Sequence, residues 1–255
     1  MIIFYIMSTI QELISIDKQA QQIHNKNKQQ IEDYFGFIHD FDELANLGLK
    51  LQIIKKNSRP NYFHGYVLST CLKEYINKHN NLDNYTILET GTARGFSSMV
   101  MSHVLNQTSI NGIVHTCDLL SNISKSHNNC YLSKEKKQRV SVMECLEEWK
   151  DIRDKYIKFY VGDSKKSMNN MNLDRIHFAF LDGHHVYSYV KFELNYVKDR
   201  QQSGDVIVCD DYTKSQMPEI CKAVDEFLEN NLYEFHILYC NDGSKKRGYV
   251  YMIRK

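Results

Sequence analysis

The sequence predicts an α/β fold in which helices cover both faces of a mostly parallel sheet. From residue 85 to residue 230, apolar runs of strand length alternate with longer helical patterns, and repeated strand–helix units of this kind are typical of parallel sheets. Two further apolar runs then follow each other, joined by Asn241-Asp242-Gly243-Ser244. Because this turn is a hairpin signal, the last strand should run antiparallel to its neighbour.

The predicted elements follow one another in a regular order. A helix over 62–78 comes first, because Val67, Cys71 and Ile76 fall on one face. Apolar runs predict strands at 85–90, 112–118, 157–161, 176–182, 205–210, 233–240 and 247–253. Between them, helical spacing predicts helices at 96–106, 133–155, 165–170, 186–200 and 217–230.

We expect one main domain with an N-terminal extension. The chain has 255 residues, of which 42% are hydrophobic and 25% charged, enough for one sizeable core. Residues 1–60 show patchy helical spacing and match no motif. We interpret them as a helical extension that either caps the substrate side or forms a homo-oligomer contact, and we assign residues 61–255 to the main domain.

Composition and charge exclude several classes of partner. The chain has 32 Lys plus Arg against 31 Asp plus Glu. A net charge this small is not expected to attract nucleic acid or an anionic membrane electrostatically. The opening MIIFYIM lacks a preceding basic residue and a cleavage site, and no stretch approaches ~20 apolar residues. The seven cysteines form no CxxC pair, which favours reduced thiols in the cytoplasm. We therefore expect a soluble protein with a small-molecule partner.

Residues 88–98, LETGTARGFSS, read as a buried strand, a glycine turn and the start of a helix. Glycine lets the backbone approach a ligand without a Cβ in the way, and the first helical turn offers free N–H groups. The turn could equally be a structural connection, and its serine could be a helix N-cap. The candidate ligand-binding residues here are Glu89, Gly91, Thr92, Gly95 and Ser97.

Acidic residues end the next strands, where open α/β sheets bind their ligands. Asp118 lies one strand–helix unit after the glycine turn, and its carboxylate could accept two hydrogen bonds from a ribose diol. It could also form a turn or cap a helix. Asp163, followed by Ser164, could accept a hydrogen bond from an exocyclic amine or merely cap the helix near Lys165.

Asp182, Asp210 and Asp211 end two further strands. Carboxylates at neighbouring strand ends repel each other, and their burial costs several kcal/mol unless a cation or strong donors compensate. Mg²⁺ takes oxygen ligands and keeps open positions for substrate oxygens. We therefore expect a Mg²⁺ site, with solvated loop acids as the alternative.

His184 and His185 directly follow the first of these acids and its glycine. A histidine with a pKa near ~6.5 is the usual general base at neutral pH, so both are candidates for that role, and a packing or turn-capping role is the alternative. Zinc held by both is less attractive, because adjacent residues rarely point at one ion.

At these residues the chain resembles the class I S-adenosylmethionine-dependent methyltransferases. Within that class it looks like the metal-dependent O-methyltransferases of macrolide sugars and the related cephalosporin-hydroxylase-like proteins. The pieces that carry the resemblance, in order over about residues 85–230, are LETGTARGFSS, HTCDL, VGDS, LDGHHVYSYVKFEL, and GDVIVCDDY followed by PEICKAVDEFL.

The resemblance implies a Rossmann-like sheet of seven strands with the last one antiparallel. It implies S-adenosylmethionine bound by the glycine turn, Asp118, Asp163, Ser164 and Asp182, and Mg²⁺ held by the three acids named above. In some relatives the base lies three positions after the first metal-binding acid, which is His185 here. In others it is an acid two positions after it, where this chain has His184, so the base stays open between the two.

The function that the resemblance implies is Mg²⁺-dependent O-methyl transfer to a small-molecule hydroxyl. A sugar or other polyol is the first expectation for the acceptor, and a phenolic or catechol-like compound the second. The alternatives are a hydroxylase-like tailoring enzyme of the same fold and a catalytically silent cofactor-binding protein. An NAD-dependent oxidoreductase is disfavoured because the turn lacks GxGxxG spacing.

Overall fold

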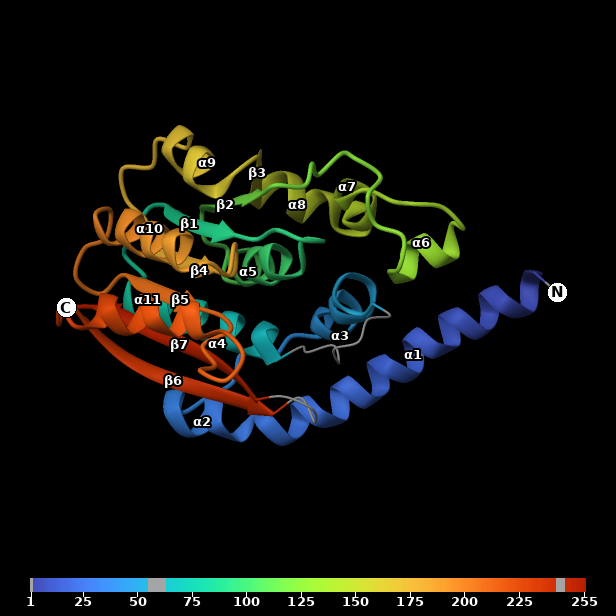
Figure 1. The fold of residues 1–255 in the computed structure, drawn as a ribbon, viewed down its shortest axis with the longest axis horizontal. Coiled ribbons are helices and arrows are strands. Elements are labelled where there is room, and N and C mark those ends of the chain that lie inside the picture. Colours follow the sequence, from blue (N-terminus) through green and yellow to red (C-terminus); the bar gives the residue numbers. More distant parts are fainter. Residues whose placement is uncertain (1, 55–62, 242–245) are drawn as a thin grey trace.

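The protein is described here by a computed structural model that covers residues 2–54, 63–241 and 246–255. It forms a seven-stranded sheet in the order β3-β2-β1-β4-β5-β7-β6 (Figure 1). The strands are β1 Tyr85–Thr90, β2 Gly112–Asp118, β3 Ile157–Val161, β4 Phe178–Leu181, β5 Val206–Cys209, β6 Tyr233–Asn241 and β7 Lys246–Arg254.

The pairing of the strands confirms the predicted mixed sheet. Strands β1 to β5 pair in parallel, whereas β7 is antiparallel to both β5 and β6. Residues 242–244 of the expected hairpin turn lie outside the described residues. The first strand, β1, lies near the centre of the sheet. The next two strands are added on one side of it and β4 on the other, so the strand order reverses between β1 and β4. Ligands bind at such a reversal, beyond the carboxyl ends of the strands.

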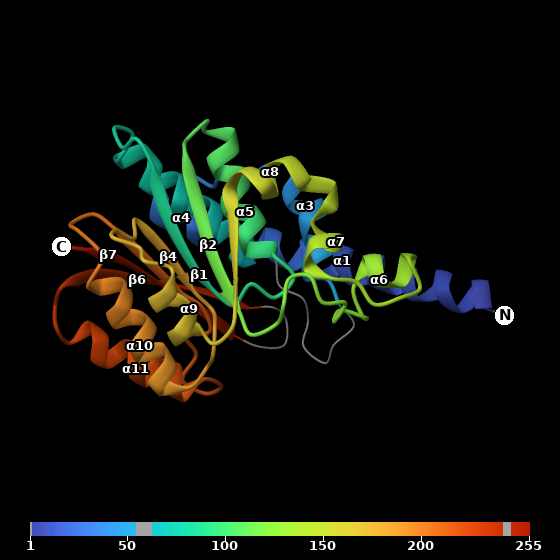
Figure 2. The same ribbon diagram turned by 90° about the horizontal axis from the view of Figure 1, so that it is seen from above.

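Helices cover both faces of the sheet, as Figure 2 shows. One face carries α4 Phe63–Lys78, α5 Phe96–Gln107 and α8 Lys150–Tyr156, and the other carries α9 Ser164–Asn170, α10 Tyr187–Lys198 and α11 Pro218–Leu228. Successive strand residues point to opposite faces, so Phe178 belongs to the first apolar core and Ala179 to the second. The helices predicted for the main domain, except one, match the observed helices closely.

The exception is the helix predicted over 133–155, which is wrong as a single element. The structure has α6 Tyr131–Glu135, α7 Val142–Cys145, a 3₁₀ turn η2 Glu147–Trp149, and then α8. Lys137 has a positive φ of 56°, a conformation that ends helices. Ser141 starts α7 with a capping box that it shares with Glu144. The S-x-x-E pattern at 141–144 was the sequence signal for this break.

The N-terminal extension is helical, as expected. It consists of α1 Ile2–Asn27, α2 Gln29–Phe35, α3 Glu43–Leu47 and a π-helical turn η1 Gly48–Gln52. Figure 1 shows α1 running away from the sheet towards the N-terminus. The expected boundary between residues 60 and 61 lies outside the described residues, and the expected oligomer contact stays a prediction. Among the described helices, none has both the length and the apolar character needed to cross a membrane.

Candidate active site

The site begins where β1 and β4 end side by side. Thr90 and Leu181 are paired in the ladder, so Gly91 and Asp182 follow at the same level. A Cβ built on Gly91 would lie 2.0 Å from the carbonyl oxygen of Asp182, and Gly91 has a φ of +90°. Glycine is therefore required here because two chain segments approach each other closely. This is the role of a structural connection, which was the alternative to ligand binding for this turn.

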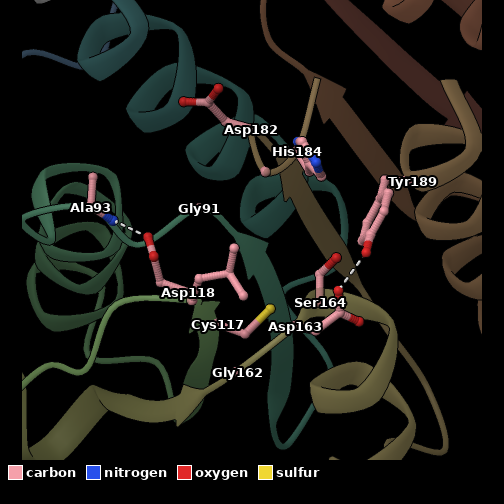
Figure 3. A pocket seen from close by; sticks show the side chains of 12 residues that line it. Gly91, Ala93, Cys117, Asp118, Gly162, Asp163, Ser164, Asp182, His184 and Tyr189 are labelled. Atoms are coloured by element: carbon pink, nitrogen blue, oxygen red, sulfur yellow. Dashed lines mark hydrogen bonds between the residues drawn. The ribbon is translucent and has the colours of Figure 1, made fainter. Parts of the chain in front are cut away.

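A cavity of about 450 Å³ opens over this point, a volume typical of small-molecule sites. Figure 3 shows its walls, which come from the ends of β1 to β4 and the start of α10. It brings together five of the predicted ligand-binding residues, which are Gly91, Asp118, Asp163, Ser164 and Asp182. The remaining walls are Ala93, Cys117, Leu119, Gly162, Gly183, His184 and Tyr189.

The two acids that follow β2 and β3 are also engaged with the protein itself. Asp118 accepts hydrogen bonds from the backbone N–H groups of Ala93 and Leu120, both at 2.8 Å. Asp163 caps α9 and accepts a hydrogen bond from the Tyr189 hydroxyl at 2.6 Å (Figure 3). The turn-forming and capping alternatives are therefore realised, and both carboxylates still line the cavity.

Glu89 lies behind the glycine turn, and Thr92 belongs to the turn itself. Glu89 is fully buried and accepts a hydrogen bond from the Thr116 hydroxyl at 2.5 Å and one from Ser98. Burial raises the pKa of Glu89 to about 7. Thr92 shares a 2.5 Å hydrogen bond with Thr116. These contacts hold the turn against β2 and α5, so the Glu89 side chain lies inside the protein and does not line the cavity.

Gly95 does not line the cavity that was expected to involve it, and Ser97 does not cap the helix that follows it. Gly95, with a φ of 84°, is the N-cap residue of α5, so the N-cap alternative for Ser97 is wrong. A Cβ on Gly95 would lie 2.9 Å from Cδ1 of Leu146, which makes this glycine a packing requirement too. Ser97 is left to line a second cavity.

The second cavity, of about 280 Å³, adjoins the first. Its walls share Gly91, Ala93 and Asp182 with the larger cavity. The N-terminal extension contributes Leu51, Gln52 and Ile54, and the cap alternative stays a prediction. The other walls are His64, Thr92, Arg94, Phe96, Ser97, His185, Asp210, Asp211 and Arg247.

Arg94 joins the extension to the glycine turn. Its Nε donates to the carbonyl oxygen of Leu51 at 2.5 Å, and its terminal nitrogen donates to the carbonyl oxygen of Gln52 at 3.4 Å. The guanidinium thereby satisfies carbonyl groups at the end of η1. Leu51 and Gln52, which line the second cavity, are consequently attached to the glycine turn, which lines the first cavity.

Three potential metal ligands meet in the second cavity. Asp182, His185 and Asp211 each offer a ligand atom, and these atoms lie within 4.8 Å of one another. Nε2 of His185 is 3.4 Å from Oδ1 of Asp182 and 3.7 Å from Oδ2 of Asp211. The hydrogen bond to Asp182 raises the pKa of His185. Arg247 lies 3.4 Å from Oδ1 of Asp211 and contributes positive charge at the edge of this group.

Asp210, the third expected metal ligand, lies beside this group and not within it. It is buried, and its Oδ1 accepts a hydrogen bond from the backbone N–H of Asp211 at 2.6 Å. Burial and the neighbouring charges of Asp182 and Asp211 raise the pKa of Asp210 well above its usual value. Burial likewise raises the pKa of Asp182. Acids that repel each other in this way fit a site for a hard divalent cation.

The two adjacent histidines face different cavities. His184 lines the larger one, where its ring centroid lies 4.7 Å from that of Tyr189, whereas His185 lines the smaller one beside the acids. This separation agrees with the expectation that neighbouring residues do not point at one ion. Four further lining residues, Tyr189, His64, Arg94 and Arg247, were not predicted from the sequence. Tyr189 could have been considered because it lies in the LDGHHVYSYVKFEL segment.

Residues 88–212 match the model of a family described as a methyltransferase domain. The chain therefore carries a methyltransferase domain. The seven strands and the antiparallel last strand are those that the resemblance to the class I methyltransferases implied. The matched residues line both cavities, and the other lining residues are those of the extension, His64 and Arg247. No curated protein matches the chain at a significant level.

Solved structures support the fold of this methyltransferase domain. The O-methyltransferase NovP is 16% identical, with 95% of this chain and 98% of that chain covered and a TM-score of 0.58. TomG from Streptomyces achromogenes is 14% identical, with 89% and 96% covered and a TM-score of 0.58. An O-methyltransferase from Bacillus cereus is 13% identical, with 92% and 100% covered and a TM-score of 0.57.

Proposed function

We propose that the protein is an S-adenosylmethionine-dependent O-methyltransferase that methylates a hydroxyl group of a small molecule. The observation that carries this proposal is the meeting of two cavities at Gly91 and Asp182. With the methyl donor in the larger cavity and the acceptor in the smaller one, the reacting groups meet at the shared wall. Holding two reactants in contact in this way lowers the barrier by removing much of the entropy cost of their encounter.

The larger cavity suits S-adenosylmethionine. Asp118 would accept hydrogen bonds from the ribose hydroxyls, and Asp163 with Ser164 would lie on the adenine side. TomG was solved with S-adenosylmethionine and the Bacillus cereus enzyme with S-adenosylhomocysteine. Their shared fold supports the same class of ligand for this chain.

The smaller cavity suits Mg²⁺ together with an acceptor. Asp182, Asp210 and Asp211 would hold the ion, because carboxylate oxygens are the ligands that Mg²⁺ prefers. When bound, the ion supplies a positive charge that lowers the pKa of an acceptor hydroxyl. The raised pKa values of Asp182 and Asp210 support this assignment, since a cation would relieve the repulsion among these acids.

His185 is the base that we propose among the two adjacent histidines. Its Nε2 lies beside Asp182 and Asp211 in the acceptor cavity, and the neutral tautomer that carries its proton on Nδ1 can accept the proton of the hydroxyl at Nε2. The flanking carboxylates would stabilise the protonated imidazole that results. His184 faces the larger cavity and is therefore less suited to this role.

The walls of the smaller cavity favour a sugar or other polyol as the acceptor. Among its described lining residues, Phe96 alone carries a phenyl or phenol ring. Gln52, His64 and Arg247 offer polar groups in the same cavity, and these can hydrogen-bond several hydroxyls. A phenolic acceptor would find fewer aromatic partners here.

The experiment that tests this proposal is an acceptor screen with isotopically labelled S-adenosylmethionine. Monosaccharides, nucleotide-linked sugars and catechols would be offered with and without Mg²⁺, and products would be identified by mass. We expect a polyol to gain a methyl group in a Mg²⁺-dependent reaction. A product that gains an oxygen atom would instead favour the hydroxylase-like alternative. Failure of the protein to bind the methyl donor would overturn the proposal.

We further propose that the protein works in the cytoplasm. Cys71, Cys117, Cys130, Cys145, Cys209 and Cys221 are buried free thiols. Free thiols are typical of proteins from reducing compartments.

A further inference from the structure

Asp210 has surroundings that differ from those of the other two acids. Its Oδ1 is held by the backbone N–H of Asp211 at 2.6 Å. Its Oδ2 lies 4.0 Å from Nδ1 of His64, a buried histidine on α4. A movement of about 1 Å would bring these two atoms within hydrogen-bonding distance. His64 thus faces the second oxygen of this buried carboxylate, and the buried phenol of Tyr249 also lies close enough to Asp210 to feel its charge.

The packing of α4 fixes the position of this imidazole. Its ring centroid lies 4.9 Å from that of Phe96 and 6.0 Å from that of Phe180. The next residue, Gly65, allows the close approach, because a Cβ there would lie 2.8 Å from Cδ1 of Leu44 and 3.0 Å from Cζ of Phe96. Two aromatic neighbours and a tightly packed backbone leave the ring little freedom to turn away from Asp210.

Among the described residues, the other charged groups around Asp210 are Asp182, Asp211 and Arg247. Asp182 and Asp211 repel it, and Arg247 attracts it from β7. The Arg247 guanidinium is placed against Asp211, at 3.4 Å from Oδ1. The imidazole of His64 is therefore well placed to direct the Asp210 carboxylate towards the neighbouring acids.

We propose that His64 is a positioning residue of the metal site, whose Nδ1–H orients Asp210 so that this acid can join Asp182 and Asp211 as a ligand. This inference rests on the proposed function. Residues that orient a metal ligand through a hydrogen bond typically contribute 10- to 100-fold to metal affinity. The role explains why a histidine from a helix outside the recognised motifs reaches the acid cluster.

The test compares three substitutions of His64 by their affinity for Mn²⁺ and Mg²⁺, measured by electron paramagnetic resonance and calorimetry without acceptor. His64→Asn keeps an amide nitrogen near the position of Nδ1, whereas His64→Gln places it near Nε2, and His64→Phe removes it. His103→Phe is the control, because His103 is buried and stacks on Phe41 at 5.4 Å away from both cavities. Thermal unfolding and S-adenosylhomocysteine binding report whether each variant folds.

We expect His64→Phe and His64→Gln to bind the metal about 10- to 100-fold more weakly, with His64→Asn and His103→Phe within about threefold of the wild type. If His64→Phe does not fold, a difference between the Asn and Gln variants still supports the role. Equal metal affinity in the Asn and Gln variants, or an unchanged affinity in His64→Phe, would overturn it while leaving the proposed function intact. A wild-type protein that binds neither ion would overturn this role together with the metal dependence of the proposed reaction, whereas the proposed methyl transfer itself would still be tested by binding of the methyl donor.

Discussion

Gly91 and Asp182 touch through their backbones at the point where the two cavities meet. No side chain fits between them, since a Cβ on Gly91 would lie 2.0 Å from the Asp182 carbonyl oxygen. The same residue pair therefore shapes the wall of the larger cavity and fixes the first acid of the smaller one. A change at Gly91 should therefore disturb both sites together. A glycine that contacted only the larger cavity would not have this effect.

The substitution Gly91→Ala tests this coupling. We expect it to weaken S-adenosylhomocysteine binding and metal binding together, because Asp182 must move to admit the Cβ. The matched control is Gly36→Ala, since Gly36 also has a positive φ, +77°, but open space around the added Cβ. The control should cost only the ~1 kcal/mol of left-handed strain. Equal losses of unfolding free energy in the two variants, measured in urea, would contradict the steric argument.

Asp118→Ala should weaken S-adenosylhomocysteine binding by ~1–3 kcal/mol, the loss expected when a charged acceptor leaves donors unpaired. Part of this loss would arise because the turn is held less firmly, since Asp118 also accepts hydrogen bonds from Ala93 and Leu120. Calorimetry gives the affinity, and the melting temperature gives the contribution of the turn. An unchanged affinity would remove Asp118 from the binding site.

His185→Ala should lower kcat by ~10²- to 10⁴-fold, the usual contribution of a general base. His184→Ala should lower it less, because this imidazole faces the other cavity. Metal affinity, measured separately for both variants, distinguishes a base from a ligand: a large loss of metal affinity in His185→Ala would make His185 a ligand. An inactive His184 variant beside an active His185 variant would transfer the role of base to His184.

Stability should depend on pH through Glu89. Burial raises its pKa to about 7 in the folded protein, from a usual value of 4.5. Between these two values the folded state binds more protons than the unfolded state, so this contribution to stability decreases as the pH rises from about 4.5 to about 7 and then levels off. Glu89→Gln should remove about 2–3 kcal/mol of this change. Urea unfolding at pH 5 and pH 8 measures it, and an identical pH dependence in both proteins would refute the assignment.

The parts of the site that could be predicted from the sequence are those that lie directly at strand ends. Asp118, Asp163, Asp182 and Asp211 follow strands whose apolar runs are easily recognised, and parallel strands bring their carboxyl ends to one edge. Hydrogen-bonding partners were harder to foresee. Nothing in the local sequence indicates that Glu89 turns inward to Thr116 and Ser98.

Other residues of the site, His64 and Gln52 among them, reach it through packing between distant segments. His64 arrives on α4 because Gly65 lets that helix approach Leu44 and Phe96, and Gln52 arrives because Arg94 binds the end of η1. Such contacts depend on tertiary structure and leave no periodic pattern. The break in the helix predicted over 133–155 is different, since the capping box of Ser141 and Glu144 was visible in the sequence.

The most direct test of the central claim measures turnover and cofactor affinity in the same preparation after removal of metal ions. We expect EDTA to abolish methyl transfer to the acceptor identified in the screen, added Mg²⁺ to restore it, and the calorimetric affinity for S-adenosylhomocysteine to stay within about twofold throughout, because the metal site belongs to the second cavity. Asp211→Asn should reproduce the effect of the chelator. Full turnover in the metal-free protein would contradict the metal-dependent mechanism and leave a transferase that acts by proximity alone.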